Sequence, residues 1–332
     1  MNRGVGTENA VRTEAGNALL RAVALPSCSL DTVRQLIPQC TTEELCLALT
    51  KAAEFDGFGA VGELARVVGP AAAESAALRH AAFHNRLDLV RELIPVSDPR
   101  ANSSEALYWA AARGHVEVVR ELIPASDPGA EESRALWAAA HFGNLGAVRE
   151  LVPVSDPKAR ESYALRSAAE RGHLGVVRAL IPVSDATMGG SMALSVAAYF
   201  GHLDVVRELI PVSDPRACRS RALCWAAEKE QLDVVCELLP VSDASQAFRV
   251  ELEHAVKILE QDGIREVANS LPLRALNLLA RCMDENLLEQ VAFDVPAGLI
   301  DLMPHLAAWR GAMRLREATK GAGVTPRRRR SL

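Results

Sequence analysis

Histidine, serine and aspartate recur along this chain in combinations that could do chemistry. His115, His173 and His202 each follow a glycine, and Ser-Asp pairs return at a fixed interval. A histidine base that activates a serine beside a carboxylate is a common arrangement for nucleophilic catalysis. A catalytic site needs one special histidine, whereas these are equivalent to one another. We therefore predict that each histidine bonds neighbouring backbone and each Ser-Asp pair forms a turn, so no catalytic residue is expected.

Metal and cofactor sites are not expected either. The remaining histidines have no H-E-x-x-H or Cys/His spacing, and the seven cysteines include no C-x-x-C pair. An odd number of unpaired cysteines suits reduced thiols in the cytoplasm, and Cys218, Cys224 and Cys236 are predicted to be buried or half-buried. No glycine-rich loop follows a strand-like segment. The sequence therefore predicts no metal and no cofactor.

The interval between the recurring residues is 29, which indicates one structural unit copied several times. The Ser-Asp pairs begin at Ser97, Ser126, Ser155, Ser184, Ser213 and Ser242. A second landmark, Ala-Leu, keeps the same step from Ala77, Ala106, Ala135, Ala164, Ala193 and Ala222. Units at both ends are eroded, as expected where a terminal repeat must face water on one side.

A single unit reads as two short helices joined by a tight turn. In residues 104–128, Leu107, Ala110 and Ala111 share one face of a first helix, and Val119 and Leu122 share one face of a second. Each helix is too short to be stable alone, so its apolar face must be covered by the next unit. The sequence therefore predicts an all-α helical-hairpin repeat solenoid.

Local signals within the unit set more detailed expectations. Ser104 is expected to cap the first helix with its hydroxyl, and Gly114 suits the left-handed exit from that helix. Glu117 and Arg120 stand three residues apart on the second helix, so a weak ion pair within the helix is expected. Asp127 is expected to cap the turn into the following unit.

The residues of one unit resemble the ankyrin repeat. The segment ALYWAAARGHVEVVRELI, residues 106–123, is similar to the family pattern T-P-L-H-x-A-A-x-x-G-H-x-x-V-V-x-x-L-L, and the resemblance covers roughly residues 18–270. The unit is shorter than the family's ~33 residues, its T-P pair is absent, and IPVSDP replaces the loop that builds the usual β-hairpin. The resemblance implies an ankyrin-like solenoid without projecting hairpins. A generic helical-hairpin solenoid is the structural alternative.

The resemblance divides the chain into segments and implies a function. We expect a polar leader over residues 1–16, an array over 17–244, degenerate repeats or a C-terminal helical cap over 245–320, and a basic tail over 321–332. Ankyrin arrays mainly offer concave surfaces to protein partners, and few act as enzymes. The resemblance therefore implies a non-enzymatic scaffold that binds a protein partner.

Candidate partner-binding residues lie where the units differ, just before each turn. Four of the twelve residues at these positions are aromatic, against 4 % of the chain. Aromatic rings and arginine are favoured interface anchors, although Phe142 and Phe200 could instead fill gaps between repeats. The predicted partner-binding residues are Phe83, His84, Arg113, His141, Phe142, Arg171, Tyr199, Phe200 and Lys229.

The charge is uneven along the chain. The net charge is −5, but residues 310–332 carry eight Lys or Arg and one Glu, so the remainder is distinctly acidic. Nucleic acid is therefore not an expected partner, except through a tail that contains Arg327, Arg328, Arg329 and Arg330. The tail could also direct nuclear import, although a disordered end is the simpler interpretation. A cytoplasmic location is expected, with delivery into a host cell as an alternative.

Two further hypotheses remain open at this stage. The alanine- and arginine-rich, nearly identical repeats would suit a bacterial ankyrin effector. The segment SLPLRALNLLARCMDENLLEQVAF, residues 270–293, faintly resembles an F-box, so an adaptor that recruits a ubiquitin-ligase component is the alternative function. A degenerate capping repeat is the other interpretation of that segment.

Overall fold

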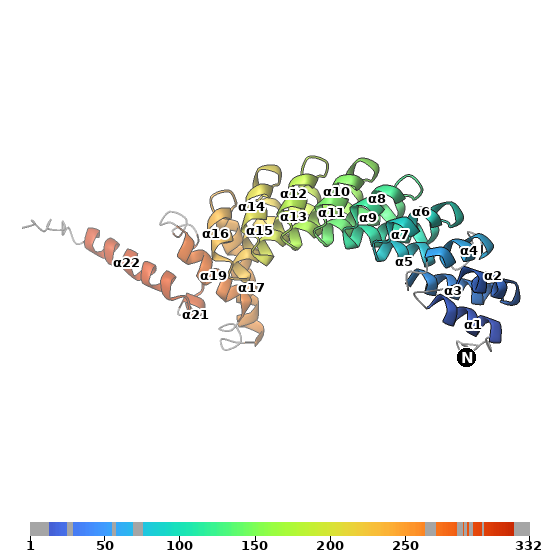
Figure 1. Cartoon of the computed structure of the whole chain (residues 1–332). Coiled ribbons are helices and arrows are strands. Elements are labelled where there is room, and N and C mark those ends of the chain that lie inside the picture. Colours follow the sequence, from blue (N-terminus) through green and yellow to red (C-terminus); the bar gives the residue numbers. More distant parts are fainter. Residues whose placement is uncertain are drawn as a thin grey trace, which may run out of the picture. The chain divides into compact units, whose positions relative to one another are not determined.

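The computed structural model describes most of the chain as helices (Figure 1). The described residues are 13–24, 29–54, 58–68, 76–262, 270–283, 288, 291, 295–300 and 302–321. Every regular element within them is an α- or 3₁₀-helix, and they contain no strand. The predicted leader lies outside them except for residues 13–16, and so do the basic tail beyond residue 321 and its Arg327–Arg330 run. No described helix combines the length and the apolar character needed to cross a membrane.

The chain divides into two compact units, Met1–Ala164 and Leu165–Leu332. We call these the first and the second unit, and each of them contains several of the 29-residue repeats. Helix α11 (Ala159–Glu170) contains the boundary between them. The predicted array limits at residues 17 and 244 stay a prediction.

The first unit is built from helix pairs that stack on one another. The first helix of each pair packs on the first helix of the next, and the second helices pack in the same way. The first helices are α1 (Glu14–Val23), α3 (Thr42–Glu54), α5 (Ala76–Phe83), α7 (Ala101–Arg113) and α9 (Ala130–His141). The second helices are α2 (Leu30–Leu36), α4 (Phe58–Val68), α6 (Leu87–Leu93), α8 (Val116–Leu122) and α10 (Leu145–Leu151).

The second unit repeats this arrangement and adds C-terminal helices. Its first helices are α13 (Met188–Phe200), α15 (Ala217–Glu228) and α17 (Ala244–Asp262), and its second helices are α12 (Leu174–Leu180), α14 (Leu203–Leu209) and α16 (Leu232–Leu238). Helix α19 (Leu271–Cys282) packs on α15, α16 and α17. The short α21 (Ala297–Ile300) and the longer α22 (Pro304–Gly321) follow. The part of the F-box-like segment that the structure describes is chiefly α19, which Ser270 caps by accepting a hydrogen bond from the Leu273 N–H.

The predicted helical hairpin is confirmed in the pair α7 and α8. Leu107, Ala110 and Ala111 on α7 are fully buried, as are Val119 and Leu122 on α8. Alanine at the buried positions of the first helix lets neighbouring helices approach closely, and the leucines and valines fill the space between the two layers. The core of each unit therefore runs between its two layers of helices, and each pair completes the core of its neighbours.

The connectors between pairs are helical turns, as expected for repeats without the β-hairpin. Short 3₁₀-helices follow several second helices, with a proline at an early position in each. They are η1 (Ile37–Gln39), η3 (Ile94–Val96), η4 (Val152–Val154) and η5 (Ile210–Val212). The Asp127 carboxylate accepts a hydrogen bond from the Gly129 N–H at 3.0 Å, so Asp127 closes the turn as expected.

The prediction that Ser104 caps its own helix was wrong. Asn102, Ser103 and Ser104 adopt left-handed backbone angles, with φ between 50° and 61°. Equivalent triplets recur in the following repeats. In this conformation the buried Ser104 hydroxyl accepts a hydrogen bond from the Asp127 N–H in the next connector, at 2.8 Å. Left-handed angles in residues other than glycine cost roughly 1–2 kcal/mol each, so this bond between repeats helps to hold a strained turn.

Arg120 was expected to pair with Glu117 within α8, but its ion-pair partner is on another helix. Arg120 pairs with Glu150 on α10, and the same contact joins the second helices of other pairs. Arginine and glutamate thirty residues apart thus form a ladder, which we call the arginine–glutamate ladder. Its other rungs are Arg91–Glu121 in the first unit, and Arg178–Glu208 and Arg207–Glu237 in the second. Each exposed rung contributes only roughly 0.2–1 kcal/mol, so the rungs add little to the apolar packing between pairs.

Candidate functional site

The turns after the first helices are fixed by bonds to the preceding repeat. Gly114 is left-handed at φ 75°, and the Nε2 atom of His115 lies 3.0 Å from the Phe83 carbonyl oxygen, which accepts its hydrogen bond. In the second unit, Nε2 of His202 bonds the Glu170 carbonyl in the same way at 2.9 Å. The structure thus confirms that these histidines lock turns. They thereby set the position of the variable residues just before each turn.

The variable residues before the turns are accessible. In the first unit, His84, Arg113 and Phe142 are exposed, whereas Phe83 and His141 are half-buried. In the second unit, Arg171, Phe200 and Lys229 are exposed and Tyr199 is half-buried. Phe142 and Phe200 are 54 % and 48 % exposed, so neither ring fills a gap between repeats.

In the first unit, the structure brings several of the predicted residues together. The Arg113 guanidinium lies 3.9 Å from the centre of the Phe83 ring, and the His84 ring contacts the edge of Phe83 at 4.9 Å. His141 and Phe142 meet edge to face at 4.9 Å. Cation–π contacts of this kind hold an arginine in place while leaving its hydrogen-bond donors available.

In the second unit, Tyr199 is the centre of the corresponding cluster. The Lys229 ammonium group lies 4.6 Å from the centre of the Tyr199 ring. Phe200 contacts Tyr199 at 4.9 Å and lies beside the His202 ring at 6.2 Å. Each unit therefore carries its own group of aromatic and cationic side chains at the ends of its first helices.

The predicted partner-binding residues did not include the two tryptophans that lie within the first helices beside them. Trp109 and Trp225 lie on the first helices and are only half-buried. Trp109 contacts Phe83 at 5.3 Å, and Trp225 contacts Tyr199 at 5.7 Å, so both tryptophans extend the clusters of predicted residues. The signal that could have found them is variation between units, since these positions hold Trp, Ala, Ser or Val in different copies.

Glu105 links two neighbouring first helices beneath this surface. Its carboxylate accepts hydrogen bonds from Arg79 at 2.8 Å and from the Trp109 indole at 3.1 Å. Burial acts to raise the pKa of Glu105, but the bonds from Arg79 and Trp109 outweigh it and the pKa lies below its usual range. Glu105 therefore stays ionised and holds Trp109 in one orientation.

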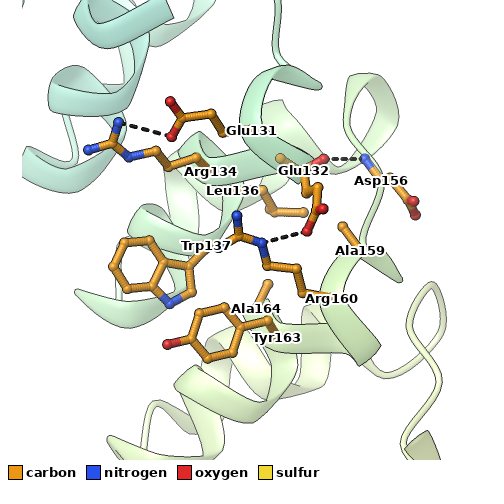
Figure 2. Close-up of a pocket in the computed structure, with 11 residues that line it drawn as sticks. Glu131, Glu132, Arg134, Leu136, Trp137, Asp156, Ala159, Arg160, Tyr163 and Ala164 are labelled. Atoms are coloured by element: carbon orange, nitrogen blue, oxygen red, sulfur yellow. Dashed lines mark hydrogen bonds and ion pairs between the residues drawn. The ribbon is translucent and has the colours of Figure 1, made fainter. Parts of the chain in front are cut away.

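A pocket opens between α9 and α11 in the first unit (Figure 2). Its volume is about 210 Å³, which suits one inserted side chain. The Trp137 and Tyr163 rings lie parallel on one wall, with centres 5.7 Å apart, and the Trp137 indole N–H is buried without a hydrogen-bond partner. The Arg160 guanidinium, which pairs with Glu132, also lines the pocket. The pocket thus offers flat apolar faces and charges of both signs.

The cysteines do not form one buried cluster. Cys224 is buried as predicted, but Cys218 and Cys236 are exposed, so the prediction was wrong for these two. Their positions face solvent because Cys218 lies in the strained connector and Cys236 lies on the outward face of α16. Among the described residues, no three or more His, Cys, Asp or Glu side chains are placed to hold a metal ion.

Solved structures that are similar to this chain include the human ASB11 ankyrin repeat domain and an ankyrin repeat domain from Acinetobacter baumannii AYE. The human domain is 20 % identical with a TM-score of 0.45, and the match covers 49 % of this chain and 82 % of that one. The bacterial domain is 24 % identical with a TM-score of 0.43, and the match covers 50 % and 98 %. No curated protein sequence matches the chain.

The family described as ankyrin repeats in three copies matches residues 78–163, 135–217 and 165–247. Together these matches span just over half of the chain, and they coincide with the units whose helical hairpins, locked turns and buried alanines are described above. Ankyrin repeats are generally protein-interaction modules, and these matches show that the chain belongs to the ankyrin repeat family.

Proposed function

We propose that this chain is a non-enzymatic scaffold that binds a protein partner through the first-helix ends of its repeats. The exposed rings of Phe142 and Phe200 carry this proposal, because they stand about half uncovered beside fixed turns. Large exposed rings on a rigid framework are typical anchors, since little conformational entropy is lost when they are buried by a partner.

The neighbouring side chains support the same function. In the first unit Arg113 rests on Phe83, and in the second unit Lys229 rests on Tyr199. A cation thus lies at the end of the first helix that packs beside the helix of each exposed phenylalanine. An apolar anchor beside an arginine or lysine suits a partner with an apolar residue close to acidic or carbonyl groups. The pocket beside Trp137 and Tyr163 adds a place for one partner side chain.

A scaffold rather than an enzyme is supported by what the candidate chemical groups already do. His115 and His202 are bonded to backbone carbonyl groups. The Ser104 hydroxyl accepts a hydrogen bond from the Asp127 N–H, and the Asp127 carboxylate accepts one from the Gly129 N–H. These side chains stabilise the stack instead of facing a substrate. We also propose a reducing compartment such as the cytoplasm, a proposal supported by the free thiols of the described cysteines.

The test is affinity capture from a cell lysate with the intact chain and with Phe142→Ala, Phe200→Ala and the double variant, read by mass spectrometry. We expect a protein that is captured by the intact chain and lost from the double variant, with an unchanged circular dichroism spectrum and Tm. The single variants report on each unit separately.

Val154→Ala and Val212→Ala are matched controls, because these valines are also exposed but lie on the 3₁₀ connectors. They should leave capture unchanged. Capture that survives in the Phe142/Phe200 double variant, or that falls equally with the valine variants, would place the binding surface elsewhere.

A further inference from the structure

The arginine–glutamate ladder is interrupted at one place in the first unit. In each intact rung, an arginine on one second helix pairs with a glutamate thirty residues later on the next. The same spacing joins Gly62 on α4 to Glu92 on α6, so glycine stands where the arginine would be. Among the residues that the structure describes, Glu92 has no ion-pair partner. The repeat thus supplies the carboxylate of a rung without its cation.

Space is present where the missing side chain would lie. A Cβ atom added to Gly62 would meet only the Glu92 carboxylate oxygen, at 3.6 Å, and nothing else within 4 Å. A hollow of about 450 Å³ opens beside these two residues. In the intact rungs an arginine starts from the equivalent position, and the hollow beside Gly62 has room for one such side chain.

The walls of the hollow have the chemistry that an arginine side chain needs. Leu30 from α2, with Pro95 and Val96 from η3, provides apolar surface on which a methylene stem can lie. The Glu92 carboxylate can accept two parallel hydrogen bonds from a planar guanidinium, which a lysine ammonium cannot match.

The other charged groups of the hollow leave Glu92 as its unpaired carboxylate. Glu63 and Arg66 lie on the same hollow, and Glu63 is already paired with Arg34 at 2.7 Å. The Arg34 bond lowers the pKa of Glu63, and the Arg66 charge acts in the same direction, so Glu63 is ionised and compensated. Glu92 is the carboxylate left to attract an incoming positive charge.

We propose that the hollow between Gly62 and Glu92 is a binding site for an arginine side chain of a protein partner. The site lies on the second helices, whereas the proposed scaffold function uses the ends of the first helices. It therefore goes beyond that function and does not depend on it. The incoming guanidinium completes the interrupted rung as Arg91 and Arg120 complete the two rungs that follow it.

The probe for this site is a capped arginine, Nα-acetyl-arginine N-methylamide, added to the full isotope-labelled chain and followed by NMR. We expect a saturable shift of the Gly62 amide signal and of the Glu92 side-chain signals. Capped citrulline, which has the same shape without the charge, and capped lysine should bind about tenfold more weakly or less. Equal binding of lysine or citrulline would overturn the assignment to arginine.

Variants separate this site from general attraction to an acidic protein. Gly62→Arg fills the hollow from within and should abolish binding, and Glu92→Gln should do the same by removing the charge. Glu121→Gln, which removes the carboxylate of an intact rung, should leave binding unchanged. Binding that persists in folded Gly62→Arg and Glu92→Gln would overturn the proposal.

A gain of binding provides the complementary test. Arg120→Gly should open an equivalent hollow beside Glu150, so the folded variant should bind a second equivalent of capped arginine, with shifts at α8 and α10. A folded Arg120→Gly variant that still binds one equivalent would contradict the argument that the ladder defines the site.

Discussion

The carboxyl group of Glu251 on α17 lies buried beside the thiol of Cys224 on α15, and each group acts on the pKa of the other. Glu251 is 1 % exposed and Cys224 is 5 % exposed, and the Glu251 Oε2 atom has no hydrogen-bond partner. Glu251 also occupies the position that holds the alanine of the Ala-Leu pair in the earlier units. An ionisable group thus replaces a methyl group in the core of the second unit.

This burial predicts a loss of stability as the pH rises. Burial raises the pKa of Glu251 to about 7, and the Glu228 carboxylate acts in the same direction, while the Cys224 thiol partly opposes the shift. The unfolded chain releases the proton near pH 4.3. Between that pH and about 7 only the folded state keeps the proton, so stability is fully present below pH 4.3 and falls until about pH 7.

Glu251→Gln should remove this pH dependence, because the amide keeps the shape and does not titrate. We expect the variant to be more stable than the intact chain at pH 8, by on the order of 1–3 kcal/mol, and the difference to shrink towards pH 5. Urea denaturation followed by circular dichroism across this range measures it. Glu253→Gln, on the exposed side of α17, is the control and should keep the slope of the intact chain. Identical slopes in both variants would exclude Glu251 as the titrating group.

The cysteines should differ sharply in their reactivity. Burial, together with the nearby Glu251 and Glu228 carboxylates, raises the pKa of Cys224, and the thiolate is the reactive form. Cys218 and Cys236 are exposed. We expect iodoacetamide at pH 8 to modify Cys218 and Cys236 in the folded chain and to modify Cys224 only after denaturation. Peptide mass spectrometry reads the sites, and early modification of Cys224 in the folded chain would contradict its burial.

The fold was predictable because the residues that determine it recur at a fixed spacing and act within a single repeat. The spacing of Leu107, Ala110 and Ala111 fixes a helix face, and Gly114 marks the end of the helix, so the hairpin follows from one unit read alone. The partners of Ser104 and Arg120 were predicted wrongly because Asp127 and Glu150 lie in the next repeat. Residues within one helix give no sign of a better partner thirty positions away.

The candidate site was predictable in position but less so in extent. Variation between units located Phe142 and Phe200 at the helix ends, and the structure adds that both rings are substantially exposed. The parallel rings of Trp137 and Tyr163 were not expected as a pair, because the two residues occupy different positions in adjacent repeats. Their contact depends on how α9 and α11 pack, and a single unit read alone does not determine that packing.

The left-handed connectors predict an unusual cost for one small substitution. Gly190 has φ 66°, and an added Cβ atom would lie 2.5 Å from the Cys218 sulfur. Gly190→Ala should therefore destabilise the second unit by roughly 1–2 kcal/mol or more, measured by urea denaturation. Gly311→Ala is the control, because nothing lies within 4 Å of its added Cβ in helix α22. It should be neutral or stabilising by up to ~1 kcal/mol. Equal effects would argue against the left-handed turn at Gly190.

The stacked core makes one leucine far more important than another of the same size. Leu165 on α11 is fully buried, whereas Leu232 at the start of α16 is 48 % exposed. Leu165→Ala removes packing between layers and leaves a cavity, so it should lower the free energy of unfolding by ~2–5 kcal/mol. Leu232→Ala makes the same chemical change at the surface, where losses usually stay within about 0.5 kcal/mol. Urea denaturation measures both. A near-neutral Leu165→Ala, or a loss as large in Leu232→Ala, would contradict the stacked core that buries Leu165.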